Sequence, residues 1–386
     1  ESSPNTSFAM LELGQVTLRI PSLSQDLEAF LTNITRNSEG LCTFSGRLRR
    51  TKIIWEKKIS QKILFNVANF HNFVGDIIQS TKECTGWCRG RLELLSDTWK
   101  VILDQINHSS EFMRKFESRG GFLVTHIGSL ERIDGHEFSY EEAEKSINSL
   151  HYFLSFLRGF WCGPVLPVGI FSDQKTWEQW DNLRLTPWKE GISWFPKLKP
   201  NDIGQAFKGF MKKCEDPLWG VPIGHAIHWY VEANLSAGAV EGSIILIQAA
   251  LELLGWVYLV EDTKQFGSSK FENLPAEQKL RELLKTLNIP TTIPPELSGL
   301  KNAAALLRTT DGPSIFVRLR NGLVHPKKNK RNLVSSTAVA VRIQAWTLGL
   351  WYLELLLLRL FNYSGVYYRR FISGFPDRVE ALVPWA

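Results

Sequence analysis

The chain has 386 residues, a length typical of two or three domains, and its 45 Lys and Arg exceed 39 Asp and Glu to give a net charge of +6. Hydrophobic residues make up 44% and charged residues 22%, which excludes global disorder and predicts a folded protein with a sizeable core. Five scattered cysteines exclude a disulfide-bonded scaffold. The small basic excess permits an anionic partner without requiring one.

Residues 1–200 predict a mixed α/β domain that is rich in strands. We expect strands at residues 10–20, 91–95, 98–103, 121–127 and 165–171. Ser96-Asp97 is a plausible hairpin turn, and Ser139 with Glu142 forms a capping-box pattern that predicts a helix ending near Arg158. The many aromatic residues of this region could stack nucleic-acid bases, but we favour a hydrophobic core.

After residue 200 one helix signal follows another. We expect helices at residues 202–214, 224–234, 241–262, 275–287, 297–308, 313–324 and 337–362. The predicted organisation is a helical connector over residues 201–235 and a helical bundle over residues 236–386. The fold class is therefore α+β, with a strand-rich N-terminal region followed by an all-α C-terminal bundle.

The longest apolar stretch, residues 345–361, contains Glu354 and Arg359 and so predicts a buried helix instead of a membrane span. The polar residues 1–7 lack the basic and then apolar pattern of a signal peptide. Both features predict a cytoplasmic protein with no membrane contact.

The segment 314–331 carries the strongest chemical signal in the sequence. Fourteen positions without an acidic residue hold the six cations Arg318, Arg320, Lys327, Lys328, Lys330 and Arg331. His325 lies among them, and its side chain titrates near neutral pH. Such a cluster predicts a phosphate-binding site with a titratable group.

Helical geometry places these side chains on different faces. Arg318, Asn321 and His325 share one polar stripe, whereas Arg320 lies about 140° from His325 on an ideal helix. Because Pro326 disfavours helical geometry at the residue before it, we expect His325 at the end of the helix. Geometry therefore favours Arg318 as the neighbour of His325.

Arg320-Asn321-Gly-Leu-Val-His325 resembles the R-x4–6-H motif of the HEPN superfamily of ribonucleases. The resemblance covers roughly residues 239–361 and implies a HEPN-like helical bundle that cleaves RNA without a metal or other cofactor. It assigns catalysis to Arg320, Asn321 and His325, with Arg318 as the possible alternative arginine because its spacing also fits. It also implies that Lys327, Lys328, Lys330 and Arg331 bind the RNA substrate.

A mixed N-terminal region before such a bundle is similar to the ApeA-type bacterial anti-phage proteins. This similarity implies abortive infection as the role and a phage-derived trigger at the N-terminal domain. The resemblance further implies a homodimer, since competent bundles of this superfamily pair across a two-fold axis. The alternative is a catalytically inactive HEPN-like bundle that serves as an RNA- or nucleotide-binding module.

The two longest predicted helices, residues 241–262 and 337–362, also favour a dimer. They are apolar over more of their circumference than one small bundle easily covers. Leucines between residues 348 and 360 lie on opposite sides of the second helix, so we expect part of it to pack on a second copy, or else on the N-terminal domain.

Overall fold

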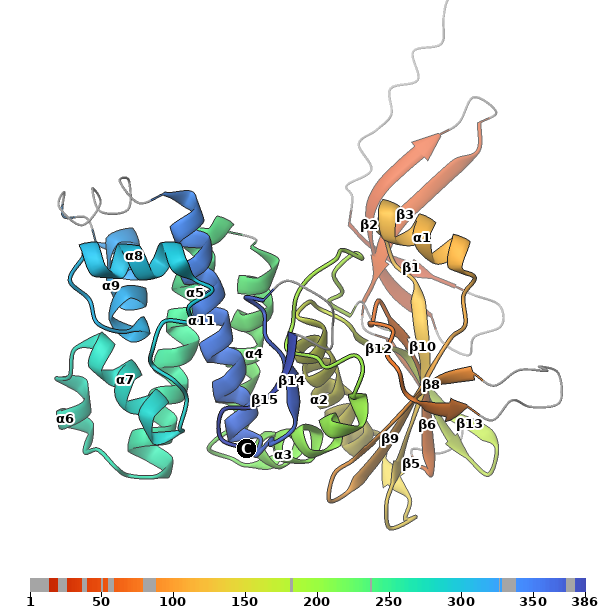
Figure 1. The fold of residues 1–386 in the computed structure, drawn as a ribbon. Coiled ribbons are helices and arrows are strands. Elements are labelled where there is room, and N and C mark those ends of the chain that lie inside the picture. Colours follow the sequence, from red (N-terminus) through yellow and green to blue (C-terminus); the bar gives the residue numbers. More distant parts are fainter. Residues whose placement is uncertain are drawn as a thin grey trace, which may run out of the picture.

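The computed structural model describes residues 14–19, 26–36, 40–49, 51–54, 59–78, 88–180, 183–236, 238–325, 327, 338–372 and 379–386. Strands gather in the N-terminal part and helices in the C-terminal part, as Figure 1 shows. The predicted α+β class is confirmed.

The N-terminal part is built on an eight-stranded sheet in which all neighbouring strands are antiparallel. Its strands, in order across the sheet, are β4 Thr51–Ile54, β13 Gln174–Trp180, β12 Gly163–Phe171, β6 Lys62–Ala68, β10 Val124–Arg132, β9 Trp99–Gln105, β8 Cys88–Leu95 and β7 Asp76–Ile78. The predicted hairpin is confirmed between β8 and β9, where the Ser96 hydroxyl accepts a hydrogen bond from the Trp99 backbone N–H at 2.8 Å.

Smaller elements surround this sheet. They are the three-stranded sheet of β1 Gln15–Leu18, β2 Leu27–Arg36 and β3 Cys42–Leu48, the pair β5 Ile59–Ser60 and β11 Phe138–Ser139, and the helix α1 Ser110–Arg119. The strand expected over residues 10–20 is present as β1, and residues 10–13 and 20 lie outside the described part. The strand expected at 121–127 begins three residues later and runs to Arg132.

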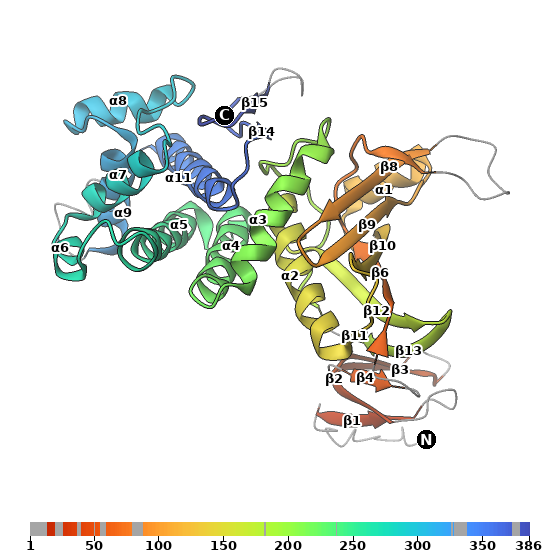
Figure 2. The same ribbon diagram turned by 90° about the horizontal axis from the view of Figure 1, so that it is seen from below.

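Helix α2, Tyr140–Arg158, lies against the eight-stranded sheet, as Figure 2 shows. It begins as the sequence predicts: Ser139 and Glu142 form a capping box in which each side chain accepts from the other residue's backbone N–H. Phe153, Leu154 and Leu157 of α2 are fully buried, and so is Trp177 of β13. The aromatic residues of this region therefore form a core, as we favoured.

The C-terminal part is a helical bundle. Its elements are η1 Pro200–Asp202, α3 Ile203–Glu215, α4 Gly220–Leu235, α5 Ala239–Trp256, the π-helical turn η2 Val257–Asp262, α6 Ser268–Glu272, α7 Ala276–Thr286, α8 Ser298–Leu306, α9 Gly312–Val324, α11 Val339–Leu360, and the strand pair β14 Val366–Tyr368 and β15 Glu380–Leu382. The predicted helices are present with small shifts at their ends. The sequence predicts an all-α bundle, so the strand pair β14–β15 is a difference from that prediction.

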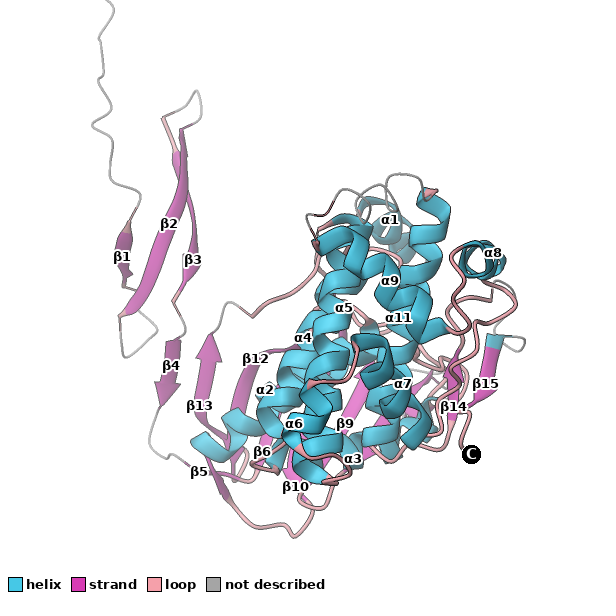
Figure 3. Cartoon of the chain, turned by 90° about the vertical axis from the view of Figure 1, so that its left-hand side faces the viewer, coloured by secondary structure: helices cyan, strands magenta, loops and turns pink. Residues whose placement is uncertain are grey.

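Helix α11 runs through the bundle with helices packed around it, as Figure 3 shows. The helix packs against α3, α4, α5, α8 and α9, and its leucines between residues 348 and 360 are at most 8% exposed. The expectation that these leucines form a dimer interface is therefore wrong. Their apolar surface is buried within the chain itself, and the dimer stays a prediction on other grounds.

One described stretch, Ala239–Asp262, is long and apolar enough to cross a membrane by length and composition. In the bundle it packs against α4, α7, α9 and α11, and 56% of the apolar window is buried. It is thus placed as a core helix of the bundle. The sequence also predicts a buried helix over residues 345–361, and most of this stretch is buried in α11.

The two parts share one continuous hydrophobic core that passes from the sheet through α2, α3 and α4 into the bundle. Near their junction, Glu354 of α11 is fully buried and forms an ion pair with Arg370. Tyr230 of α4 donates its hydroxyl hydrogen to the same carboxylate at 2.7 Å. The domain boundaries that the sequence predicts at residues 200 and 235 stay predictions.

Candidate functional site

The motif lies on α9, whose first turn is fixed by two polar contacts of Asp311. Asp311 caps the helix by accepting from the Ser314 backbone N–H at 2.9 Å, and Arg281 of α7 pairs with the same carboxylate at 2.6 Å. Burial disfavours the charged form of Asp311, but the hydrogen bonds from Arg281 and Ser314 outweigh it and hold its pKa below the ordinary value. Pro313 follows in the first turn, where its missing N–H costs nothing.

Close packing against α11 fixes the rest of α9. A Cβ on Gly312 would lie 2.0 Å from the Tyr352 hydroxyl, so only glycine fits at that crossing. Likewise, a Cβ on Gly349 would lie 2.5 Å from the Phe316 ring. The apolar side chains of Ile315 and Leu319 are buried against the bundle. The polar residues of the motif are consequently held at defined positions.

His325 lies at the end of α9, as Pro326 predicts. Its backbone is extended, with φ −92° and ψ 133°, while its N–H still donates to the Asn321 carbonyl oxygen at 3.2 Å. The residue is exposed. The imidazole is therefore accessible to a substrate, and it is not buried as a structural histidine would be.

Arg320 is half-buried and donates to the Asn321 side-chain oxygen at 3.2 Å. Its buried Nε–H has no hydrogen-bond partner among the described residues. Two carboxylates of the bundle have other partners: Glu354 pairs with Arg370, and Glu252 accepts from Gln248. In the described part of the chain, no carboxylate neutralises Arg320, which leaves its charge for an external anion.

Arg318 is exposed and points toward α8, where its guanidinium donates to the Leu307 carbonyl oxygen at 2.8 Å. The structure therefore joins the side chains of Arg320 and Asn321, connects His325 to Asn321 through the backbone alone, and holds Arg318 at the end of α8. This arrangement leaves both arginines as candidates, because each keeps free donors.

The basic segment after α9 is only partly described. Lys327 is exposed, whereas Lys328, Lys330 and Arg331 lie outside the described residues. The sequence contains no acidic residue between Asp311 and Glu354, so nothing within that stretch offsets the positive charge of the motif. Anions are attracted to such a region.

Two further features bear on ligands. Among the described residues, no three His, Cys, Asp or Glu side chains gather as a metal site would require.

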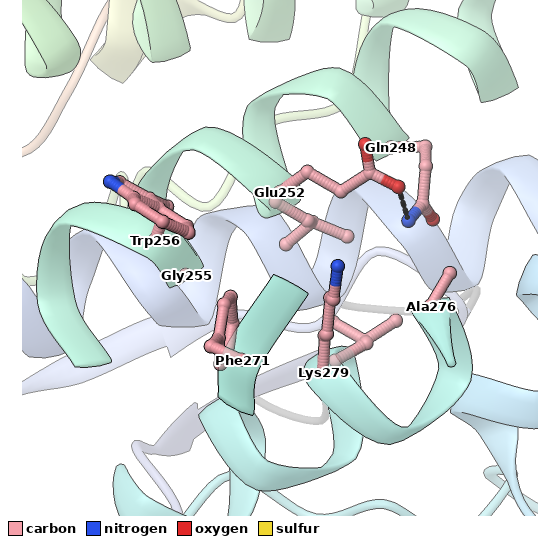
Figure 4. A pocket seen from close by; sticks show the side chains of 9 residues that line it. Gln248, Glu252, Gly255, Trp256, Phe271, Ala276 and Lys279 are labelled. Carbon is pink, nitrogen blue, oxygen red and sulfur yellow. Dashed lines mark hydrogen bonds between the residues drawn. The ribbon is translucent and has the colours of Figure 1, made fainter. Parts of the chain in front are cut away.

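A pocket of about 240 Å³ lies between α5, α6 and α7, where Gln248 donates to Glu252 at 2.8 Å near Lys279 (Figure 4). None of the predicted catalytic residues lines it.

Sequence reasoning missed a larger cleft of about 900 Å³ between the sheet and the bundle. Its walls come from segments far apart in the chain, which include His71, Lys189, Asn234, Trp346 and Arg370. No local motif joins these residues, so only the folded chain could reveal the cleft.

The fold and site define a class: an α+β protein whose antiparallel sheet precedes a helical bundle with a basic Arg-Asn-His helix end. Residues 56–191 match the YopA central domain and residues 216–380 match the YopA C-terminal domain. The chain is 30% identical over 379 residues to the SPbeta prophage-derived uncharacterized protein YopA of Bacillus subtilis (strain 168), covering 97% of this chain and 83% of that protein. It therefore belongs to the YopA family. No solved structure gave a significant match.

Proposed function

We propose that this protein is a metal-independent endoribonuclease of the HEPN type whose active residues lie at the end of α9. The observation that carries the proposal is the combination of an exposed His325 with Arg320, a cation that no described carboxylate neutralises. A structural role for either residue would favour burial of the imidazole or an ion pair for the guanidinium.

The proposed chemistry is an internal transfer at one phosphodiester of RNA. His325 removes the proton of the ribose 2′-hydroxyl, and the freed oxygen attacks the adjacent phosphorus. The bond to the 5′-oxygen breaks, and this oxygen takes up a proton from water or an imidazolium. An arginine stabilises the charge that builds on the phosphoryl oxygens, and Asn321 orients the reacting groups. The products end in a 2′,3′-cyclic phosphate and a 5′-hydroxyl.

The exposed basic residues Arg318 and Lys327 suit contacts with the RNA backbone, as do the remaining cations of the segment, Lys328, Lys330 and Arg331. The relative's origin in a prophage fits a role during phage infection of a bacterial cell. In this proposal the protein acts in the cytoplasm in abortive infection, and the N-terminal part receives a phage-derived trigger.

We expect Arg320→Ala to lower cleavage by a factor of about 10²–10³, the usual cost of removing a donor that stabilises transition-state charge. Arg318→Ala should cost much less, since that guanidinium already binds the Leu307 carbonyl oxygen. Initial rates on a fluorescent RNA compare the two variants, and each serves as the control for the other. A dead Arg318→Ala protein beside a mild Arg320→Ala protein would transfer the catalytic role to Arg318.

The active form in this proposal is a homodimer with a composite site. Val324 at the end of α9 and Val339 and Ile343 at the start of α11 are 39%, 58% and 41% exposed, so apolar surface flanks the motif. Pairing through this end of the bundle hides that surface and brings two copies of the motif together.

Mixing an Arg320→Ala chain with a His325→Ala chain is expected to restore partial cleavage, because a composite site in the mixed dimer takes its intact Arg320 and its intact His325 from different copies. Each variant assayed alone is the control. Sedimentation should show twice the mass of the chain. A monomer that cuts RNA, or a mixture as inactive as its components, would refute the composite dimer.

The second candidate function is RNA or nucleotide binding without cleavage. Exposure of Arg318 and Lys327 favours it as well, because phosphate contacts need no histidine. The two functions differ in one outcome: His325→Ala leaves all function intact in a binding module and abolishes it in a nuclease. RNA decay by the parent and by His325→Ala therefore tests the proposal.

A further inference from the structure

The cleft between the sheet and the bundle is large enough for a small organic ligand. It has a volume of about 900 Å³, within the range of roughly 300–1,000 Å³ that ligand pockets occupy. His71, Phe160 and Lys189 line it from the sheet side. Asn234, Trp346 and Tyr368 line it from the bundle side.

Two lysines line the sheet side of this cleft. Lys189 and Lys197 are on the lining with Glu190 and Glu380. Among the described residues neither lysine lies within ion-pair distance of a carboxylate, although Glu190 and Glu117 are near enough to Lys197 to act on its pKa. The Lys189 ammonium instead donates to the Leu235 carbonyl oxygen at 3.3 Å and lies 4.8 Å from the centre of the Phe160 ring. Two ammonium groups are thus available to an anion.

Behind these lysines lies Arg158, which is only 2% exposed. Its guanidinium donates to the carbonyl oxygens of Asn69 at 3.0 Å and Lys189 at 2.6 Å, and to His71 Nε2 at 3.1 Å. Among the described residues it has no carboxylate partner. Burial lowers the pKa of Arg158 to about 10, because a buried cation without a carboxylate partner is disfavoured.

His71 stands between Arg158 and the cleft. Burial lowers its pKa well below the ordinary value, and the charges of Arg158 and Lys197 lower it further. A neutral imidazole is what the contact with Arg158 requires, because Nε2 must accept the hydrogen bond. His71 therefore adds no charge to the cleft at neutral pH. The charged groups that face a ligand are the two lysines and the carboxylates of Glu190 and Glu380, with Arg158 behind them.

The bundle side offers flat apolar surface. Trp346 of α11 and Tyr368 of β14 are both half-buried and line the cleft, and Trp346 is held by its indole N–H, which donates to the Ala233 carbonyl oxygen at 3.0 Å. Rings held in this way suit stacking on a planar group. A ligand that combines a planar ring with a phosphate chain matches both sides of the cleft.

We propose that this cleft binds a nucleotide, with its phosphates at Lys189 and Lys197 and its base against Trp346 and Tyr368. The binding site stands apart from the motif on α9 and does not depend on the proposed nuclease activity. An effect of the nucleotide on cleavage would rest on that activity.

A series of contacts connects the cleft to the motif on α9, through which a bound nucleotide would affect cleavage. Trp346 and Thr347 lie in the cleft, and Gln344 on the same helix accepts from the Leu300 backbone N–H of α8 at 2.7 Å. At its other end, α8 is joined to the motif by the bond from Arg318 to the Leu307 carbonyl oxygen. A nucleotide that rigidifies α11 would therefore also rigidify α8 and α9, which hold the motif.

Isothermal titration of the full chain with ADP tests the site. ADP should bind, and adenosine and inorganic pyrophosphate should each bind at least tenfold more weakly, because each lacks one of the two recognised parts. Lys189→Ala with Lys197→Ala should weaken ADP binding about tenfold or more, the usual scale for losing charged hydrogen bonds. Lys212→Ala, which removes an exposed lysine of α3 outside the cleft, is the matched control.

Thr347→Trp fills the cleft from α11 without removing a charge, and it should also abolish ADP binding while the melting temperature stays near that of the parent. Absence of heat with ADP up to millimolar concentration overturns the proposal. So does unchanged affinity in the lysine variant or in Thr347→Trp, or pyrophosphate that binds as tightly as ADP. None of these results concerns cleavage, so the nuclease proposal is judged separately.

Discussion

Replacement of His325 by alanine is expected to lower the rate of RNA cleavage by a factor of about 10²–10⁴, the range that a general acid or base supplies. The loss should come from chemistry and not from unfolding. The imidazole is exposed at the end of α9, and the one backbone hydrogen bond of this residue, to the Asn321 carbonyl oxygen, survives the change.

His225→Ala is the matched control, because His225 is an exposed histidine of the same bundle on α4. That variant should cleave RNA at the parental rate. Circular dichroism and thermal melting should give parental values for both variants. If His325→Ala degrades RNA as fast as the parent, His325 has no part in catalysis and the binding-module function replaces the nuclease.

The second large effect concerns stability. Arg370→Met removes the partner of Glu354, a carboxylate that is fully buried. Glu354 then keeps one described donor, the hydroxyl of Tyr230. Breaking a buried ion pair from one side costs about 3–5 kcal/mol in the free energy of unfolding, because the remaining charge stays desolvated.

Urea denaturation measures this loss, with Lys212→Ala as a surface control expected to change stability by less than about 0.5 kcal/mol. The paired variant, Arg370→Met with Glu354→Leu, should regain part of the stability, since it leaves no buried charge behind. A loss below about 1 kcal/mol for Arg370→Met would show that water or a rearranged neighbour solvates Glu354.

Local signals predicted much of the fold. The capping box at Ser139 and Glu142 predicted the start of α2, because it satisfies backbone N–H groups within a few residues. Pro326 likewise placed His325 at the end of α9. Signals of this kind act over one turn and can be read without knowing the tertiary structure.

Long-range packing was beyond such signals. The apolar circumference of α11 suggested a surface for a second copy, but five helices of the same chain cover it. The sequence pattern of one helix does not indicate which other helices will pack around it. The cleft has the same origin: Arg158, Lys189 and Trp346 carry no shared pattern, and only folding brings the sheet and α11 together.

The motif itself was found from residue types and spacing, and the structure adds its contacts. Spacing alone left Arg318 and Arg320 equivalent as cations. The fold distinguishes them by partner, since Arg318 bonds the end of α8 while Arg320 bonds the Asn321 side chain. Which guanidinium meets the phosphate depends on the bound RNA and, in the proposed dimer, on the second copy.

The most direct test of the proposed ribonuclease is cleavage of RNA by the purified full chain in excess EDTA, with the chemistry of the product ends determined. We predict cleavage at the same rate with EDTA and with magnesium, and products that carry a 2′,3′-cyclic phosphate and a 5′-hydroxyl. Cleavage that EDTA abolishes and magnesium restores, or products that carry a 5′-phosphate, would contradict the assignment of catalysis to Arg320, Asn321 and His325.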